Sequence, residues 1–233
     1  MTFYLGVKAF HIMLLAAWVG MDSAQFISSF FAKNPKLHPQ TRWMATRIAN
    51  ITGMGPRTSF PLILASGLLL AYVGGFGFSA VPLWLIVVAE VAAIAWVWGL
   101  WEQFFVLEGK LVGRKPGWKV FFDREFRTFD RVVRFIIGAV MVVISFTSMF
   151  GRGPVDVFWV DWKVLLFGVV LLSSTVTRIV SLDYPVALSE IAREGSTPER
   201  EARINRALRH AYPLVLMDWT IAMIMVVIAV VRP

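Results

Sequence analysis

The sequence predicts an all-α membrane protein, a polytopic transmembrane six-helix bundle that forms a single domain over residues 1–233. Hydrophobic residues make up 58% of the chain and charged residues only 16%, a balance typical of membrane proteins rather than of soluble domains. The apolar residues also fall into six long runs. Each run reaches the roughly 20 residues that a helix needs to cross a bilayer core of about 30 Å.

The six predicted spans are residues 3–31, 57–75, 81–107, 131–150, 158–180 and 212–231. Before the last span, Ser196 and Thr197 precede Pro198, a pattern typical of a helix start, so we expect a short cytoplasmic surface helix over residues 198–209. Short glycine-rich turns connect the second span to the third and the fourth to the fifth. Connections this short favour antiparallel neighbours and one compact bundle.

The basic residues indicate the orientation of the spans. The first, third and fifth connections carry most of them, whereas the opposite side has little beyond Lys8, Arg152 and Arg232. Cytoplasmic loops are enriched in Lys and Arg, so these connections are expected in the cytoplasm and both termini outside, an N-out/C-out topology. The net charge of +8 therefore reflects the loops, and we expect membrane lipid and no nucleic acid as a partner.

The chain has no cysteine. This excludes disulfides, thiolate zinc sites, iron–sulfur clusters and the covalent attachment of c-type haem. Any metal or haem must therefore be held by His, Met, Lys, Tyr or a carboxylate.

His11 lies about two turns inside the first span, where a polar side chain needs a partner, a cavity or a ligand. Three hypotheses fit this position. In the first, the imidazole is a core side chain bonded to a carbonyl or to Glu90. In the second it is an axial ligand of haem, and in the third it binds copper together with methionine. Met13 faces away from His11 on a helix, which weakens the copper hypothesis. A bis-histidine haem is not expected, because His210 lies at the opposite membrane surface and His38 in a loop.

Four further residues are expected in the outer half of the bundle, from a rise of 1.5 Å per helical residue. Lys163 starts the fifth span, Glu90 lies near the middle of the third, and Lys8 and Met149 share the outer layer. Lys163 and Glu90 are the candidate catalytic residues. Lys163 is either an interface anchor beside tryptophan or the partner of a haem propionate or a substrate carboxylate. The candidate cofactor-binding residues are His11, Lys163, Lys8 and Met149, with His11 as the ligand of the haem iron.

A second group of charged residues is expected near the cytoplasmic ends of the spans. Their signs alternate, and side chains at helix ends reach water at modest cost, so we interpret them as a structural ion-paired belt. In this belt the arginines are expected to pair with Asp22 and Glu102. The belt comprises Asp22, Arg57, Glu102, Arg134, Arg178 and Asp218.

Short motifs give a resemblance to a known family. The sequence KAFHI at residues 8–12 resembles the first helix of the HemJ-type protoporphyrinogen oxidases and their CopD-like relatives. The sequence DWKVLL at residues 161–166 resembles the lysine-bearing helix of the HemJ type, and the chain from Arg209 to Pro233 resembles its last helix. The hairpin of residues 57–107 is extra, and GPR at its start is similar to an uncharacterised branch of bacterial membrane proteins.

The resemblance implies haem b on His11, with Lys163 close by and required, in a multi-pass protein of the bacterial inner membrane. The expected function is electron transfer between quinone or a porphyrin-like substrate and an outer-side partner. Whether the protein is itself an oxidoreductase enzyme stays open. Two other functions stay open. One is a cofactor-free membrane anchor or assembly subunit that binds a membrane or periplasmic protein or a second copy of the chain. The other is a copper or small-solute transporter.

Overall fold

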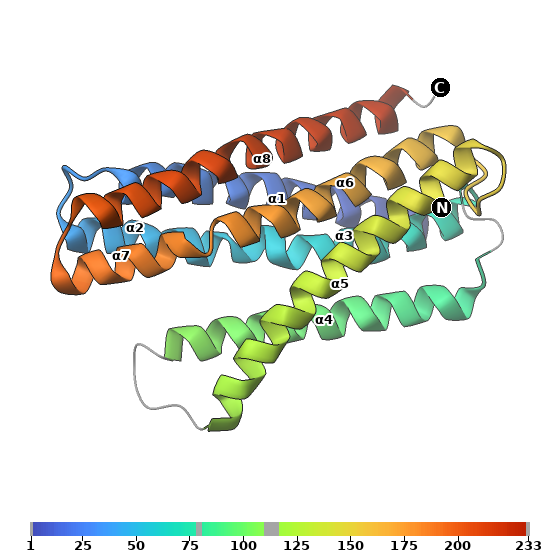
Figure 1. Cartoon of the computed structure of the whole chain (residues 1–233). Coiled ribbons are helices and arrows are strands. Elements are labelled where there is room, and N and C mark those ends of the chain that lie inside the picture. Colours follow the sequence, from blue (N-terminus) through green and yellow to red (C-terminus); the bar gives the residue numbers. More distant parts are fainter. Residues whose placement is uncertain (1, 78–80, 110–116, 232–233) are drawn as a thin grey trace.

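The computed structural model describes residues 2–77, 81–109 and 117–231, with side chains for all of these except 106–109 and 117–124. This part of the chain is helical and contains no strand (Figure 1). Its helices are α1 (Thr2–Lys33), α2 (Pro39–Thr52), α3 (Met54–Gly74), α4 (Leu83–Gly109), α5 (Gly117–Met149), α6 (Phe158–Val180), α7 (Asp183–Glu194) and α8 (Pro198–Val231).

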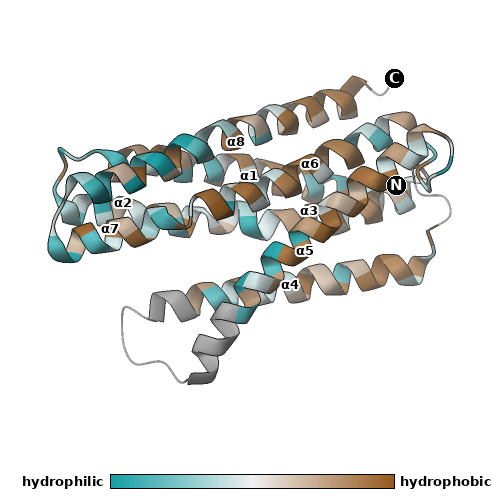
Figure 2. Ribbon diagram, viewed as in Figure 1, coloured by the Kyte–Doolittle hydropathy of each residue, from teal (hydrophilic) through white to brown (hydrophobic). Residues whose placement is uncertain are grey.

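Six helical segments of the described chain are long and apolar enough to cross a membrane. Two of them combine neighbouring helices, because α2 leads into α3 and α6 into α7. The two ends of the chain and the α5–α6 turn lie at one end of the bundle (Figure 1). Polar residues gather at the opposite end, where α2, α7 and the start of α8 meet (Figure 2). The chain is therefore an all-helical, multi-pass membrane protein.

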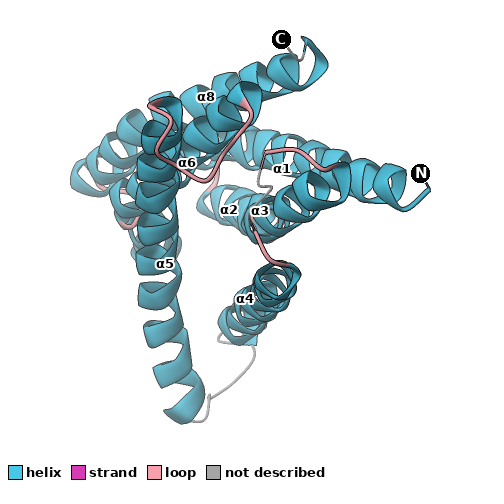
Figure 3. Ribbon diagram, turned by 90° about the vertical axis from the view of Figure 1, so that its right-hand side faces the viewer, coloured by secondary structure: helices cyan, strands magenta, loops and turns pink. Residues whose placement is uncertain are grey.

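The main core lies where α1, α3, α6 and α8 meet. Trp18 of α1 packs edge-on against Phe60 of α3, with 4.8 Å between the ring centroids, and Phe60 lies 6.2 Å from Phe167 of α6. Ala222 and Met225 of α8 belong to the same cluster. Helix α4 lies beside α3, on the far side of the bundle from α8 (Figure 3). Side-chain packing of this kind is what holds helices together in lipid.

A pair of glycines lets α5 and α6 cross closely. A Cβ atom added at Gly138 would lie 2.9 Å from the carbonyl oxygen of Gly168, and one added at Gly168 would lie 2.9 Å from the carbonyl oxygen of Gly138. Small residues allow transmembrane backbones to approach this closely. The hairpin that the sequence predicts from its short glycine-rich turn is therefore a tightly packed unit.

Most predicted span boundaries agree with the helices to within a few residues, but α5 begins much earlier, at Gly117. Helices α2 and α7 do not appear among the predicted elements, because both are short and amphipathic and neither is apolar enough to register as a span. Their buried residues nevertheless follow a helical period, for example Ala45 and Ala49 in α2 and Leu188 and Ile191 in α7.

The separate surface helix expected over residues 198–209 is wrong. Helix α8 starts at Pro198, as predicted, but runs without interruption to Val231 and contains Pro213. A proline removes one backbone hydrogen bond and disfavours a helix interior. Here buried residues on both sides of it, such as Leu208 and Ile221, pack against the other helices and keep the helix continuous.

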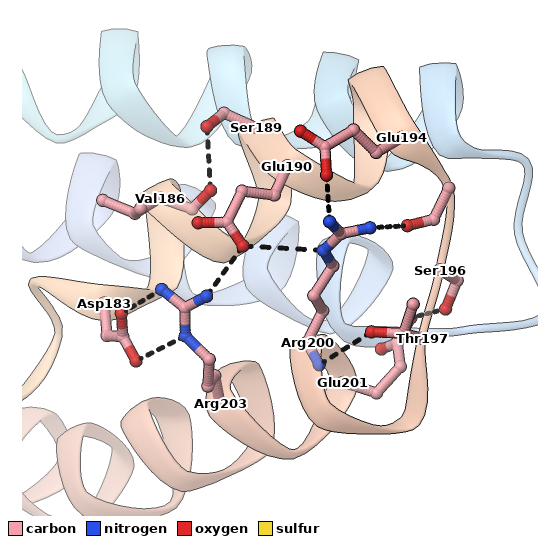
Figure 4. Close-up of polar contacts among 11 residues, drawn as sticks. Asp183, Val186, Ser189, Glu190, Glu194, Ser196, Thr197, Arg200, Glu201 and Arg203 are labelled. Atoms are coloured by element: carbon pink, nitrogen blue, oxygen red, sulfur yellow. Dashed lines mark hydrogen bonds and ion pairs between the residues drawn. The ribbon is translucent and has the colours of Figure 1, made fainter.

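The polar end of the bundle is closed by α2, α7 and residues 198–212 of α8, which together we call the end cap. Apolar residues of all three pack against Ala32 of α1. Both Nη atoms of Arg42 donate to the Glu201 carboxylate, at 2.6 and 2.9 Å. Arg203 of α8 donates in the same two-pronged way to Asp183 of α7, at 3.0 and 2.6 Å (Figure 4). Charge-assisted bonds of this geometry fix one helix against the other.

Candidate functional site

Ser66 of α3 fixes the orientation of the His11 ring on α1. The Nδ1 atom of His11 lies 2.9 Å from the Ser66 hydroxyl oxygen. That hydroxyl donates its own hydrogen to the carbonyl oxygen of Leu62 at 2.6 Å, so it accepts from the imidazole. In the neutral ring, the Nδ1 atom therefore carries the proton and Nε2 keeps its lone pair. Histidines that bind metals commonly have their other ring nitrogen held by a hydrogen bond in this way.

A cavity of about 600 Å³ opens beside this hydrogen bond, and we call it the α1–α3–α4 cavity. Its volume falls in the range of small-molecule sites. Ser66 belongs to both features, because its side chain binds His11 and also lines the cavity. The remaining lining is mostly apolar. The lining residues are Thr2, Phe3, Gly6, Val7, Phe10, Ser66, Leu69 and Glu90.

Glu90 of α4 supplies the one carboxyl group of this lining. Its Oε1 atom is buried and has no hydrogen-bond partner in the part of the chain that the structure describes. His11 bonds to Ser66 and not to Glu90, so the expected His11–Glu90 bond is not formed. An ionisable group inside a membrane protein that lines a cavity points to a functional site.

Lys163 of α6 lies in the same half of the bundle. Its Nζ atom is 5.8 Å from the ring centroid of Trp159, and that ring is 5.1 Å from the ring of Phe76 in the α3–α4 connection. The aromatic contact agrees with the expectation that Lys163 is an anchor at the membrane interface. The charge of Lys163 nevertheless acts on His11, so the two predicted site residues share one electrostatic environment.

Lys8 and Met149 are half-buried, and within the described residues neither forms a hydrogen bond or an ion pair with His11. Lys8 lies one turn before His11 on α1. Met149 ends α5, whose main neighbour is α6. Their expected roles as cofactor-binding residues stay predictions.

The charged groups near the other end of the spans are organised around Asp130 of α5. Its Oδ1 atom accepts hydrogen bonds from Trp96 Nε1 at 2.8 Å and from Arg134 Nε at 3.0 Å. Its Oδ2 atom accepts a hydrogen bond from Nη1 of Arg178 of α6. Arg57 of α3 is close enough for its charge to act on the same group. We call these five residues the Asp130 centre.

The Asp130 centre corrects the expected ion-paired belt. Arg134 and Arg178 pair with Asp130, and not with Asp22 or Glu102. Sequence reasoning misses Asp130 because the predicted span starts one residue later, at 131, and so leaves it in a loop. The signal is present, since Asp130 and Arg134 have the i, i+4 spacing of a helical ion pair.

The other belt residues lie apart from this centre. Asp22 of α1 accepts a hydrogen bond from Trp219 Nε1 of α8 at 2.8 Å. Asp218 is buried next to that tryptophan, and the charge of Asp22 acts on it. Glu102 of α4 is half-buried and forms none of these bonds. The belt is therefore two clusters on different helices rather than one ring of alternating charge.

No family model, no curated protein and no solved structure matches the chain. Within the described residues, no group of three or more His, Cys, Asp or Glu side chains is placed to hold a bare metal ion. A porphyrin differs from a bare ion, because it brings four nitrogen ligands of its own and needs only an axial side chain from the protein.

Proposed function

We propose that this protein is a haem b-binding membrane protein of the bacterial inner membrane that transfers electrons, with His11 as an axial ligand of the iron. The observation that carries the proposal is the hydrogen bond from His11 Nδ1 to Ser66, which leaves Nε2 with the lone pair. Ligating histidines typically donate their other ring proton to a protein oxygen in this way.

The cavity lined by Ser66, the hydrogen-bond partner of His11, supports the proposal. The α1–α3–α4 cavity presents aromatic and aliphatic side chains, including Phe3, Phe10 and Leu69, which exclude water from a bound apolar group. Haem b bound there would supply one-electron chemistry. Lys163 offers a positive charge to a propionate, and Glu90 is a carboxyl group able to hold or release a proton at the cavity wall. Lys163 and Glu90 are thus the candidate catalytic residues of this proposal.

The proposal includes an orientation. With both termini outside, the His11 end of the bundle faces the outer side of the membrane and the end cap faces the cytoplasm. Electrons would then pass between quinone or a porphyrin-like substrate in the bilayer and a protein partner on the outer side. The short motifs shared with the HemJ-type oxidases support this direction but do not specify the substrate.

An absorption spectrum of the protein purified from its membrane tests the proposal. We expect a Soret band, with α and β bands that sharpen on reduction with dithionite. A colourless preparation that also fails to bind added haem would contradict the proposal. It would favour a second candidate, a cofactor-free membrane anchor or assembly subunit. The observation that supports this second candidate is that Ser66 already satisfies one nitrogen of His11.

A further inference from the structure

The charges of the Asp130 centre do not balance. Arg57, Arg134 and Arg178 bring three positive charges, and among the described residues Asp130 brings the one carboxylate bonded to them. The centre therefore has an excess of two positive charges inside a membrane protein. Buried charge of one sign is costly unless an opposite charge reaches it.

Arg134 is the least satisfied member of the centre. Its side chain is fully buried, at 0% exposure. Its Nε atom donates to Asp130, but both Nη atoms are buried without a hydrogen-bond partner in the described chain. The guanidinium lies 5.0 Å from the ring centroid of Phe60 and 5.3 Å from that of Trp96. These rings stabilise the cation, but they provide no oxygen acceptor for its Nη donors.

Two members of the Asp130 centre are partly exposed. Arg57 lies in the first turn of α3 and Arg178 in the last turn of α6, both near the end that carries the end cap. The Arg178 side chain is 26% exposed, and Arg57 is half-buried. Arginines at the ends of transmembrane helices commonly lie where a membrane protein meets lipid headgroups. An anion can therefore approach the two outer arginines from the membrane surface.

We propose that the Asp130 centre binds a phosphate group, whose oxygens accept from Arg57 and from the unused donors of Arg134. A guanidinium presents its donors as a planar fork that matches phosphate oxygens. Basic pockets between transmembrane helices on the cytoplasmic side are typical sites for anionic lipid headgroups. Free phosphate offers the same oxygens. The site is separate from the α1–α3–α4 cavity, so it does not depend on the proposed haem.

Thermal unfolding of the purified protein in a neutral detergent tests the site. Three additions are titrated: inorganic phosphate, phosphatidylglycerol in mixed micelles, and phosphatidylcholine as a lipid of no net charge. We expect a saturable rise in Tm with a phosphate-bearing anion and none with phosphatidylcholine. A response to inorganic phosphate identifies free phosphate as sufficient. A response to phosphatidylglycerol alone identifies the lipid headgroup.

Matched variants separate a specific site from diffuse surface charge. Arg57→Gln should weaken the response roughly tenfold, the loss expected for one charge-assisted bond. Arg209→Gln removes the same charge from an exposed position of α8 and should leave the response unchanged. Should Arg57→Gln fail to fold, Arg134→Lys keeps the charge but loses the fork, and it should weaken the response as well. No saturable response in the wild type, or equal losses in Arg57→Gln and Arg209→Gln, would overturn the proposal.

Discussion

At the scale of the residue, Ser66 determines which ring nitrogen of neutral His11 carries the proton. Its hydroxyl donates to Leu62 and accepts from Nδ1, so it selects the neutral ring form in which Nε2 keeps its lone pair. Removing a hydrogen-bonding partner of a ligating histidine costs roughly 10- to 100-fold in affinity. We therefore expect Ser66→Ala to lower haem affinity by a factor in this range, measured by titrating the apoprotein with haem.

Ser59 provides the control for that experiment. It is also a buried serine of α3, at 2% exposure, and it lies nearly two turns away from Ser66. Ser59→Ala should keep wild-type affinity. Equal haem affinity in the wild type and in Ser66→Ala would mean that the serine does not orient a ligand.

Asp130 carries the second prediction at this scale. Asp130→Asn removes the carboxylate bonded to Arg134 and Arg178 and leaves their buried charge without an opposite charge. Breaking a buried pair in this way costs about 3–5 kcal/mol. We expect a loss of that size in the free energy of unfolding, measured by denaturant titration in micelles. Glu102→Gln, which removes a carboxylate outside the centre, should cost much less, and equal losses for the two variants would contradict the assignment.

Sequence alone identifies some of the residues of the candidate site. His11 and Lys163 are predicted because a polar side chain stands out in an apolar run. Ser66 is not, because a serine in a span is common and its bond to His11 arises only when α1 packs on α3. Asp130 is missed for a different reason, an error of one residue in the start of a span.

At the scale of the element, the crossing of α5 and α6 depends on Gly138 and Gly168. A Cβ atom at Gly138 would meet a backbone oxygen at 2.9 Å, and a backbone cannot move aside as a flexible side chain can. Overpacking of this kind costs roughly 1–3 kcal/mol. We expect Gly138→Ala to reduce stability by that amount in the same denaturant assay. Gly20→Ala is the control, because an added Cβ there meets nothing within 4 Å. A loss of stability in Gly20→Ala as large as that in Gly138→Ala would contradict this account.

The helices themselves are predictable to different extents. The six apolar runs locate α1, α3, α4, α5, α6 and the second half of α8, because crossing a bilayer imposes a length and a composition. The end cap is not predicted, since α2 and α7 are amphipathic. Their apolar faces pack against one another and against α1 and α8 rather than against lipid. The continuity of α8 through Pro213 likewise depends on packing on both sides of the proline.

At the scale of the whole molecule, the topology is open to a direct test. The chain has no cysteine, so single cysteines report their own position. Arg152 lies in the exposed α5–α6 turn at the end shared by both termini, and Ser196 is exposed in the connection between α7 and α8, beside the end cap. In intact cells we expect a membrane-impermeant maleimide to label Arg152→Cys and not Ser196→Cys. Labelling of Ser196→Cys alone would contradict this orientation and would place the α1–α3–α4 cavity on the cytoplasmic side.

The haem content of His11→Ala tests the central claim most directly. The protein should stay folded, because the core around Trp18 and Phe60 does not include the imidazole. Its Soret band should be lost or strongly reduced, whereas His38→Ala, at the start of α2 and far from the cavity, should retain it. Lys163→Ala should have a milder effect, since it removes a charge-assisted contact and not the bond to iron. Full haem retention in folded His11→Ala would contradict the account and leave the histidine as a core residue bonded to Ser66.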